Sequence, residues 1–198
     1  MRKYFLGFAV GIVAVLLVGF SYVRLGFINS CADMPVNSME SMIAMPSLDA
    51  SVARRAPEVT NPVSPTDDNL LAGMKIYQAN CALCHGDVHR PQAMLADALY
   101  PRAPQFVDDA PDMPENQNFY IIQHGVRLSG MPAWGQTLNA QQMWQVTTFL
   151  SHMDKLTPQV SDAWKTAAGG SADSSSPAAT PKINMHGMNM GGQKMHMN

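Results

Sequence analysis

The residues best suited to do chemistry are Cys81-Ala82-Leu83-Cys84-His85, here called the haem motif, followed directly by Gly86. Two thiols three positions apart can add across the two vinyl groups of one haem, and the adjacent imidazole then lies over the iron. A thioredoxin-like redox pair would need a βαβ context, and a zinc site would need two more ligands at matching spacing. The remaining cysteine, Cys31, lies fifty residues upstream. The motif therefore predicts one covalent haem with His85 as an axial ligand.

A second iron ligand is expected in the segment Gly130-Met131-Pro132-Ala133-Trp134. Met131 lies between a glycine and a proline, hence in irregular backbone, where a thioether can be directed at an iron. The alternative interpretation is a loop methionine that fills a gap in the core. The sequence thus predicts His85 and Met131 as the two axial ligands.

These motifs come in the order found in small class I c-type cytochromes, which the chain resembles over about residues 66–158. The resemblance implies an all-α cytochrome c fold around one covalent haem c, with single-electron transfer as the activity. It also implies that the first and last helices of the domain cross closely. Four features carry it: Gly73 with Tyr77, the haem motif, the run 125–134, and a helix over 143–153.

The first helix of this domain is expected to begin at Thr66, whose hydroxyl can cap the first turn and precedes Asp67 and Asp68. Gly73 lies inside this helix, where glycine costs about 1 kcal/mol relative to alanine. The resemblance supplies the compensation, because a glycine at the crossing lets the two helices approach each other.

Two further helices are expected in the domain. The last one starts after Asn139, with Gln142 completing a capping box, and ends before Pro158. A shorter helix lies between, opened by Asp112 and closed by Gly125.

Residues 88–110 are expected to form a loop, because prolines recur along them. The resemblance implies that a proline carbonyl in this loop accepts the Nδ1 proton of the axial histidine, and Pro91 is the candidate by position. We expect His89 to be a solvated loop histidine, with metal ligation as the alternative. Arg127 is expected either to meet a haem propionate or to lie on the surface.

Residues 4–23 carry no charge and follow Arg2 and Lys3. Twenty apolar residues can cross a hydrocarbon core of about 30 Å, and the basic start holds the N-terminus in the cytoplasm. We therefore predict a membrane anchor over residues 1–24, with the haem domain on the periplasmic side of a bacterial inner membrane. Two alternatives remain: a signal peptide cleaved near Ser30-Cys31-Ala32, or a lipidated Cys31.

The other boundaries follow from composition. Residues 25–65 are predicted to be a proline-containing linker with one short helix around 38–44, residues 66–160 the cytochrome c domain, and 161–184 a flexible spacer. Residues 185–198 are predicted to form a tail that is disordered alone. Its thioethers and imidazoles are soft ligands of the kind that select copper, and an unselected tail is the alternative. The ligands are Met185, His186, Met188, Met190, Met195, His196 and Met197.

Charge limits the partners. A net charge of -2 on 198 residues gives no sign of nucleic-acid binding. Residues 66–158 hold nine acidic and five basic side chains, so a basic or neutral docking surface on a redox partner is expected. The predicted function is a mono-haem electron carrier, not an enzyme, between membrane-bound respiratory partners. The alternatives are a haem peroxidase with a vacant sixth position, a copper-handling protein, and a cytochrome subunit of a larger membrane oxidoreductase complex.

Overall fold

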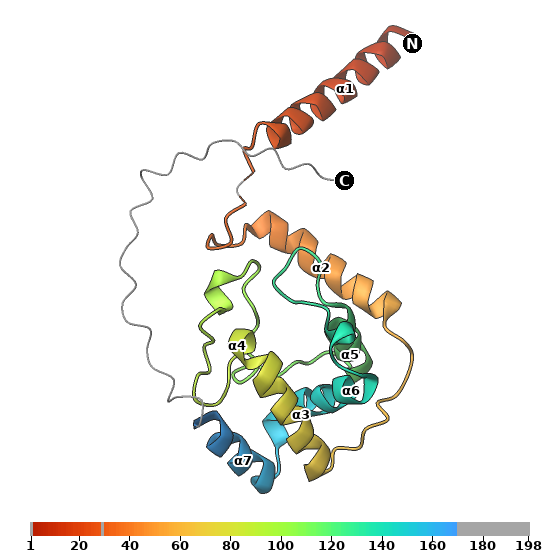
Figure 1. The fold of residues 1–198 in the computed structure, drawn as a ribbon. Helices are drawn as coiled ribbons and strands as arrows, with labels where there is room; N and C mark the ends of the chain where they lie inside the picture. Colours follow the sequence, from red (N-terminus) through yellow and green to blue (C-terminus); the bar gives the residue numbers. More distant parts are fainter. Residues whose placement is uncertain (1, 29, 170–198) are drawn as a thin grey trace, which may run out of the picture.

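The computed structural model describes residues 2–28 and 30–169. Within these ranges the chain forms helices and loops without strands, which confirms the predicted all-α fold (Figure 1). The helices are α1 (Arg2–Arg24), α2 (Ser38–Arg55), α3 (Asp67–Asn80), α4 (Ala82–His85), α5 (Glu115–His124), α6 (Ala140–Ser151) and α7 (Pro158–Gly169), with short 3-10 turns η1 (Ala96–Ala98), η2 (Trp134–Gln136) and η3 (Met153–Lys155).

The crossing of α3 and α6 forms the centre of the core. A Cβ at Gly73 would lie 2.2 Å from the carbonyl oxygen of Gln145 and 2.8 Å from the Cβ of Phe149. No other residue fits there without moving backbone, so the close crossing implied by the family resemblance is confirmed. The glycine's conformational cost is offset by the packing that it allows.

The caps of these two helices are as predicted. The Asn69 amide donates to the Thr66 hydroxyl over 3.4 Å at the start of α3. Asn139 and Gln142 form the reciprocal capping box of α6, with both hydrogen bonds at 3.0 Å. Helix α5 differs, because it begins at Glu115 after Pro114 and not at Asp112. A proline suits the start of a helix, where no amide donor is needed, and Gly125 ends α5 with φ +66° as expected.

Helix α7 extends the folded domain beyond the expected boundary at residue 160. Its Val160 and Trp164 are buried, and the Trp164 ring meets those of Tyr77 and Phe149 edge-on, with centroids 6.4 Å and 5.2 Å apart. Residues 161–169 therefore continue a helix that packs on the domain through Val160 and Trp164, where a spacer was expected. The remainder of the predicted spacer, from 170 onward, lies outside the described residues.

Helix α2 is much longer than the turn expected around 38–44. Pro46 lies within it, which is why the sequence pattern favoured a break. Contacts with the domain compensate: Val52 is buried, and the Tyr100 hydroxyl donates to the carboxylate of Glu40. Residues 38–55 thus belong to the folded structure, and α2 lies across the side of the domain nearest to α1 (Figure 1).

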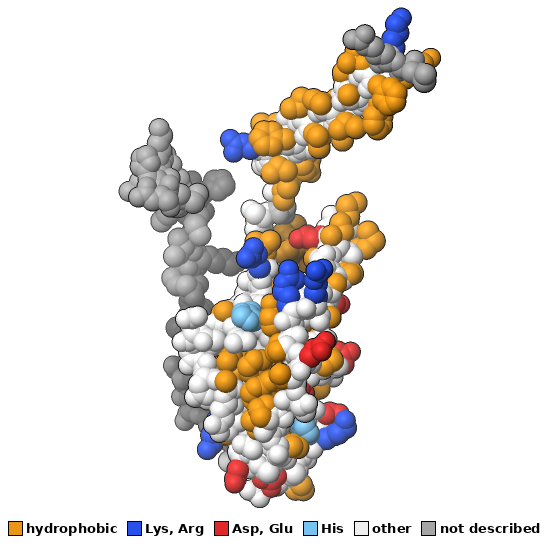
Figure 2. Space-filling model, turned by 90° about the vertical axis from the view of Figure 1, so that its right-hand side faces the viewer, with side chains coloured by type: hydrophobic (Ala, Val, Ile, Leu, Met, Phe, Trp, Pro, Cys, Tyr) orange, Lys and Arg blue, Asp and Glu red, His pale blue; other side chains and the backbone are white. Residues whose placement is uncertain are grey.

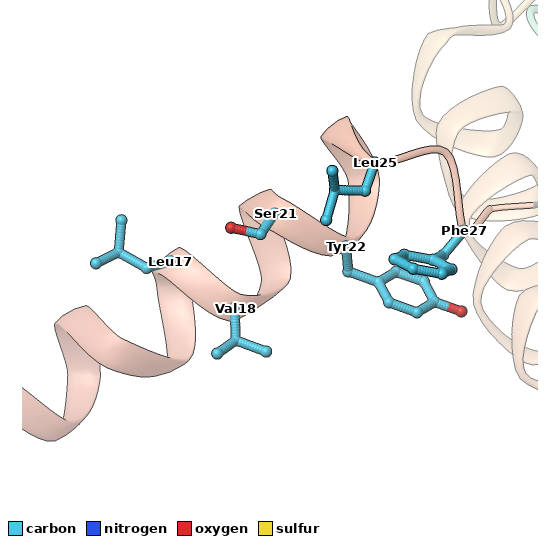
Figure 3. A pocket seen from close by; sticks show the side chains of 6 residues that line it. All are labelled: Leu17, Val18, Ser21, Tyr22, Leu25 and Phe27. Atoms are coloured by element: carbon cyan, nitrogen blue, oxygen red, sulfur yellow. The ribbon is translucent and has the colours of Figure 1, made fainter.

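Helix α1 contains one candidate membrane span, Lys3–Arg24, with a mean hydropathy of 2.4 and no buried residues. Figure 2 shows its hydrophobic side chains on every visible side, with basic side chains at both ends. A shallow apolar hollow at its C-terminal end includes the stacked rings of Tyr22 and Phe27, 5.3 Å apart (Figure 3). Length and composition suit a membrane span, and a signal sequence near the N-terminus meets the same criteria.

Candidate haem site

The haem motif forms a single tight turn. The Cys81 carbonyl accepts hydrogen bonds from the amides of Cys84 and His85, at 3.0 and 2.9 Å, so that all three side chains project from α4 and from the residue just before it. Gly86 follows with φ +83°, and a Cβ there would lie 2.5 Å from the carbonyl oxygen of Pro91. Only glycine therefore allows the chain to leave the motif in this direction.

The imidazole of His85 is buried and oriented. Its Nδ1 lies 2.8 Å from the carbonyl oxygen of Pro104, and because a carbonyl only accepts, Nδ1 donates and Nε2 keeps its lone pair. Burial lowers the pKa of His85 below its usual 6.5, and the hydrogen bond to Pro104 opposes this in part. A neutral ring with an available Nε2 is what an iron ligand requires.

The carbonyl that accepts the Nδ1 proton of His85 is therefore that of Pro104, and the prediction of Pro91 for this role is wrong. Pro91 lies against Gly86 instead, where its carbonyl occupies the space that a Cβ would need. Position after the motif was a poor guide, because the loop folds back on itself: Asp87 and Arg90 exchange backbone hydrogen bonds of 3.0 Å. The imidazole is instead reached by Pro104, nineteen positions downstream.

Two residues close to Pro104 complete the surroundings of His85, and no sequence pattern pointed to either. The ring of Phe106 stacks on the imidazole with centroids 4.3 Å apart and planes within 5°, and its amide donates to the His85 carbonyl over 3.1 Å. Gln105 is only 7% exposed. Its amide nitrogen donates to the carbonyls of Cys84 and Ala103, at 3.0 and 2.7 Å. Its oxygen accepts from the Ala93 amide at 2.6 Å, so one side chain joins three segments.

Tyr77 connects α3 to the haem motif. Its hydroxyl is buried and donates to the Gly86 carbonyl over 2.7 Å, while its ring packs against Phe149 of α6 at 5.6 Å. Burial raises the pKa of Tyr77, so the hydroxyl remains a donor at any physiological pH. The helix crossing and the motif are thereby fixed to one another.

Met131 lies in a compact loop after α5. Its carbonyl accepts from the Val126 amide over 3.1 Å, and its own amide donates to the Ser129 hydroxyl at the same distance. A Cβ at Gly125 would lie 2.7 Å from that Met131 carbonyl, so the loop folds directly over the end of α5. The Met131 residue is half-buried.

One long loop, residues 86–114, connects the two parts of the candidate site. It carries Pro104 to His85. Its Leu99 packs against Gly130, the residue before Met131, so closely that a Cβ at Gly130 would lie 2.5 Å from the Leu99 side chain. The structure thus places Cys81, Cys84 and His85 on one turn, and the loop that carries Pro104 to His85 also reaches Gly130, the residue before Met131. The oriented His85 and the half-buried Cys81 and Cys84 fit a covalently bound haem.

The other predicted site residues are placed as follows. His89 is not simply solvated, because its Nε2 lies 2.6 Å from the carbonyl of Lys165 in α7. Arg127 is exposed. Among residues 2–28 and 30–169, no group of three His, Cys, Asp or Glu side chains is arranged to hold a metal ion. The tail ligands, from Met185 to Met197, lie outside the described residues.

The helical fold and the haem motif define the central region as a class I-like c-type cytochrome domain. In particular, residues 68–150 match the family model described as cytochrome C oxidase, cbb3-type, subunit III. This match and the N-terminal apolar helix fit a membrane-anchored cytochrome c, and a cytochrome c domain implies haem c as its cofactor.

A solved structure from Kuenenia stuttgartiensis, the reducing HAO-like protein complex, resembles the chain with 19% identity and a TM-score of 0.41. The likeness covers 60% of this chain and 61% of that one, so it spans less than two thirds of either. No curated protein matches the chain.

Proposed function

We propose that the chain is a mono-haem electron carrier in which His85 and Met131 are the axial ligands. The observation that supports this best is the hydrogen bond from Nδ1 of the buried His85 to Pro104, which leaves Nε2 available in a neutral ring. Haem c, when bound, supplies a one-electron couple, and Met/His ligation raises its potential. Cys81 and Cys84 hold the group by thioether bonds, and Phe106 keeps the imidazole plane in place.

The stoichiometry and the sixth position test this proposal together. The purified protein should contain one haem per chain, and its reduced form should not bind carbon monoxide, because Met131 would hold the sixth iron position. A second haem per chain would contradict the mono-haem assignment. Rapid carbon monoxide binding would favour the peroxidase alternative, since such an enzyme needs a vacant site.

The proposal places the haem domain outside the cytoplasm, held by α1. The uncharged run is longer than the ~7 to 15 residues of a usual signal-peptide core, which supports an uncleaved anchor. Intact mass spectrometry of the membrane fraction is the test, and a mature chain that starts after residue 30 would mean cleavage or lipidation instead.

Partners within a membrane complex are a second part of the proposal. The matching family model is named for a subunit of an oxidase, which supports the idea that this carrier works inside a membrane oxidoreductase complex. Its acidic domain would dock on a neutral or basic surface. Mild solubilisation followed by co-purification tests this, and recovery of the chain alone would favour a stand-alone carrier.

Copper binding by the Met/His-rich tail stays a separate proposal, based on composition alone. Anaerobic Cu(I) titration of the full chain against a form ending at Pro181 decides it. Equal uptake by both forms would show that the tail plays no part.

A further inference from the structure

Helix α2 has two apolar faces, and only one of them has a partner in the described structure. Its inner face carries Ser41 and, seven and eleven positions later, Leu48 and Val52. This face packs on the domain, where Val52 is 3% exposed. The opposite face carries six exposed residues, here called the outer stripe. It consists of Met39, Met42, Ile43, Pro46, Ala50 and Ala53.

The outer stripe is regular. Its members follow Met39 by three, four, seven, eleven and fourteen positions, which is the spacing of one helix face. Met39, Met42 and Ile43 are 65%, 68% and 61% exposed, although a surface helix normally presents polar residues on its outer side. Glu40, Asp49 and Arg54 border the stripe without interrupting it.

The connection between α1 and α2 continues this apolar surface. Leu25, Phe27 and Ile28 are 71%, 63% and 56% exposed, and Met34 and Val36 follow before α2 begins. From Leu25 to Ile43 the chain thus exposes large apolar side chains at intervals, and the outer stripe continues beyond them with Pro46, Ala50 and Ala53. Exposed apolar side chains that gather in this way mark a site of interaction.

We propose that α2 lies in the lipid-water interface, with the outer stripe against the bilayer that α1 crosses. The thirteen residues of 25–37 can extend at most ~3.3 to 3.6 Å each, so α2 is held near the membrane whenever α1 is inserted. An in-plane helix buries such a stripe at the headgroup boundary, and Arg54, at the end of the stripe, can reach anionic headgroups.

The inner face then gives the interface a function. The Tyr100 hydroxyl bonds to Glu40 of α2, and Asn116 of α5 donates to the Pro57 carbonyl just beyond α2 over 2.9 Å. The haem domain is therefore attached to α2 at both ends of the helix. An α2 fixed on the bilayer sets which side of the domain faces the membrane and which side is offered to a redox partner. This inference rests on the proposed anchoring by α1.

Methionine oxidation provides a test with an internal reference. The full-length holoprotein, one copy per nanodisc of phosphatidylcholine and phosphatidylglycerol, would be treated with chloramine-T and the sulfoxide at each methionine measured by peptide mass spectrometry. Met94, in the loop 86–114, is the reference, because its exposed fraction of 66% is close to those of Met39 and Met42. If the stripe is buried in the interface, Met39 and Met42 should oxidise at least about tenfold more slowly than Met94. The Met94 sulfur accepts a hydrogen bond from Arg90, and any slowing from this contact would only reduce the expected ratio.

Variants and a truncation separate the outcomes. Ile43→Glu should raise the oxidation of Met39 to that of Met94 and leave the haem spectrum unchanged, whereas Gln141→Glu, at an exposed position of α6, should change neither. Equal rates at Met39, Met42 and Met94 in a protein that stays in the disc would overturn the inference while the anchor stands. Protection that disappears when the chain ends at Gly169 would overturn it too, because the tail would then be the occupant. A protein that leaves the disc would overturn the anchor itself.

Discussion

The surroundings of His85 and those of Met131 are built in different ways. His85 is buried, stacked on Phe106, and fixed by a hydrogen bond to a backbone carbonyl, with Gln105 bracing the segments around it. Met131 is half-buried in a short loop held by two backbone hydrogen bonds at Val126 and by the Ser129 hydroxyl. The position of His85 is fixed by buried polar groups that all have hydrogen-bond partners, whereas rearranging the Met131 loop should require less free energy. Changes of ligation should therefore begin at Met131.

The largest effect is expected from removing the covalent attachment on the histidine side. In Cys81→Ala/Cys84→Ala both thioether bonds are lost, and haem should be absent from a denaturing gel stained for haem. A Cys31→Ala variant serves as the control and should keep its stained band. A band that persists in the double variant would mean that the haem is attached elsewhere.

The second effect concerns the methionine side alone. Met131→Ala should abolish the weak sulfur-to-iron absorption at the red end of the oxidised spectrum and allow carbon monoxide to bind the reduced protein. The domain should remain folded, since the residue is only half-buried. Met94→Ala, at an exposed loop position, is the control. An unchanged spectrum in Met131→Ala would assign the sixth position to another side chain, with His124 or Met113 next in line.

A smaller effect is expected where the histidine side is braced. Gln105→Leu removes the partners of the Cys84 and Ala103 carbonyls and of the Ala93 amide. Leaving buried polar groups unpaired should lower the free energy of unfolding by roughly 1 to 3 kcal/mol, while the covalent haem is retained. Denaturant titration measures this against Gln136→Leu, an exposed position. Equal stability of the two variants would show that Gln105 does not brace the site.

The smallest effect is a pH dependence of the haem-free chain, in which no iron holds the Nε2 of His85. Burial holds the pKa of His85 below its usual 6.5, so between these two values the unfolded chain binds more protons than the folded one. Stability should be full above pH 6.5, which is the unfolded pKa, and decline as the pH falls below it. Denaturant midpoints measured from about pH 7 to pH 5 check the sign, and a midpoint that rises on acidification would contradict it.

Local signals in the sequence predicted much of the helical framework. The caps at Thr66 and Asn139, the stop at Gly125 and the crossing at Gly73 follow from a few neighbouring residues or from a family pattern. Helix α7 also had such a signal: the Val160 amide donates to the Thr157 hydroxyl over 3.4 Å, and Pro158 stands at the first helical position. Pro158 was expected to mark the end of the preceding helix, although a proline is equally suited to the first position of a new one.

The remainder depends on contacts between distant residues, which no spacing rule describes. Pro104 and Gln105 act on the haem motif from about twenty positions downstream, along a loop whose path is set by tertiary packing. Helix α2 continues past Pro46 because Val52 is buried and Glu40 accepts from Tyr100. Local propensity favoured a break at this proline, and tertiary contacts outweighed it.

The crossing of α3 and α6 also constrains how the domain folds. These helices, Asp67–Asn80 and Ala140–Ser151, are separated in the sequence by residues 81–139 and form the domain's most extensive helix contact. Most helical domains fold fast because their contacts are local, but here the chain must close a long loop before the core gains stability. Folding should therefore be slow for a helical protein of this size. During that delay the thiols of Cys81 and Cys84, which follow α3 directly, remain accessible for haem attachment until α6 has docked.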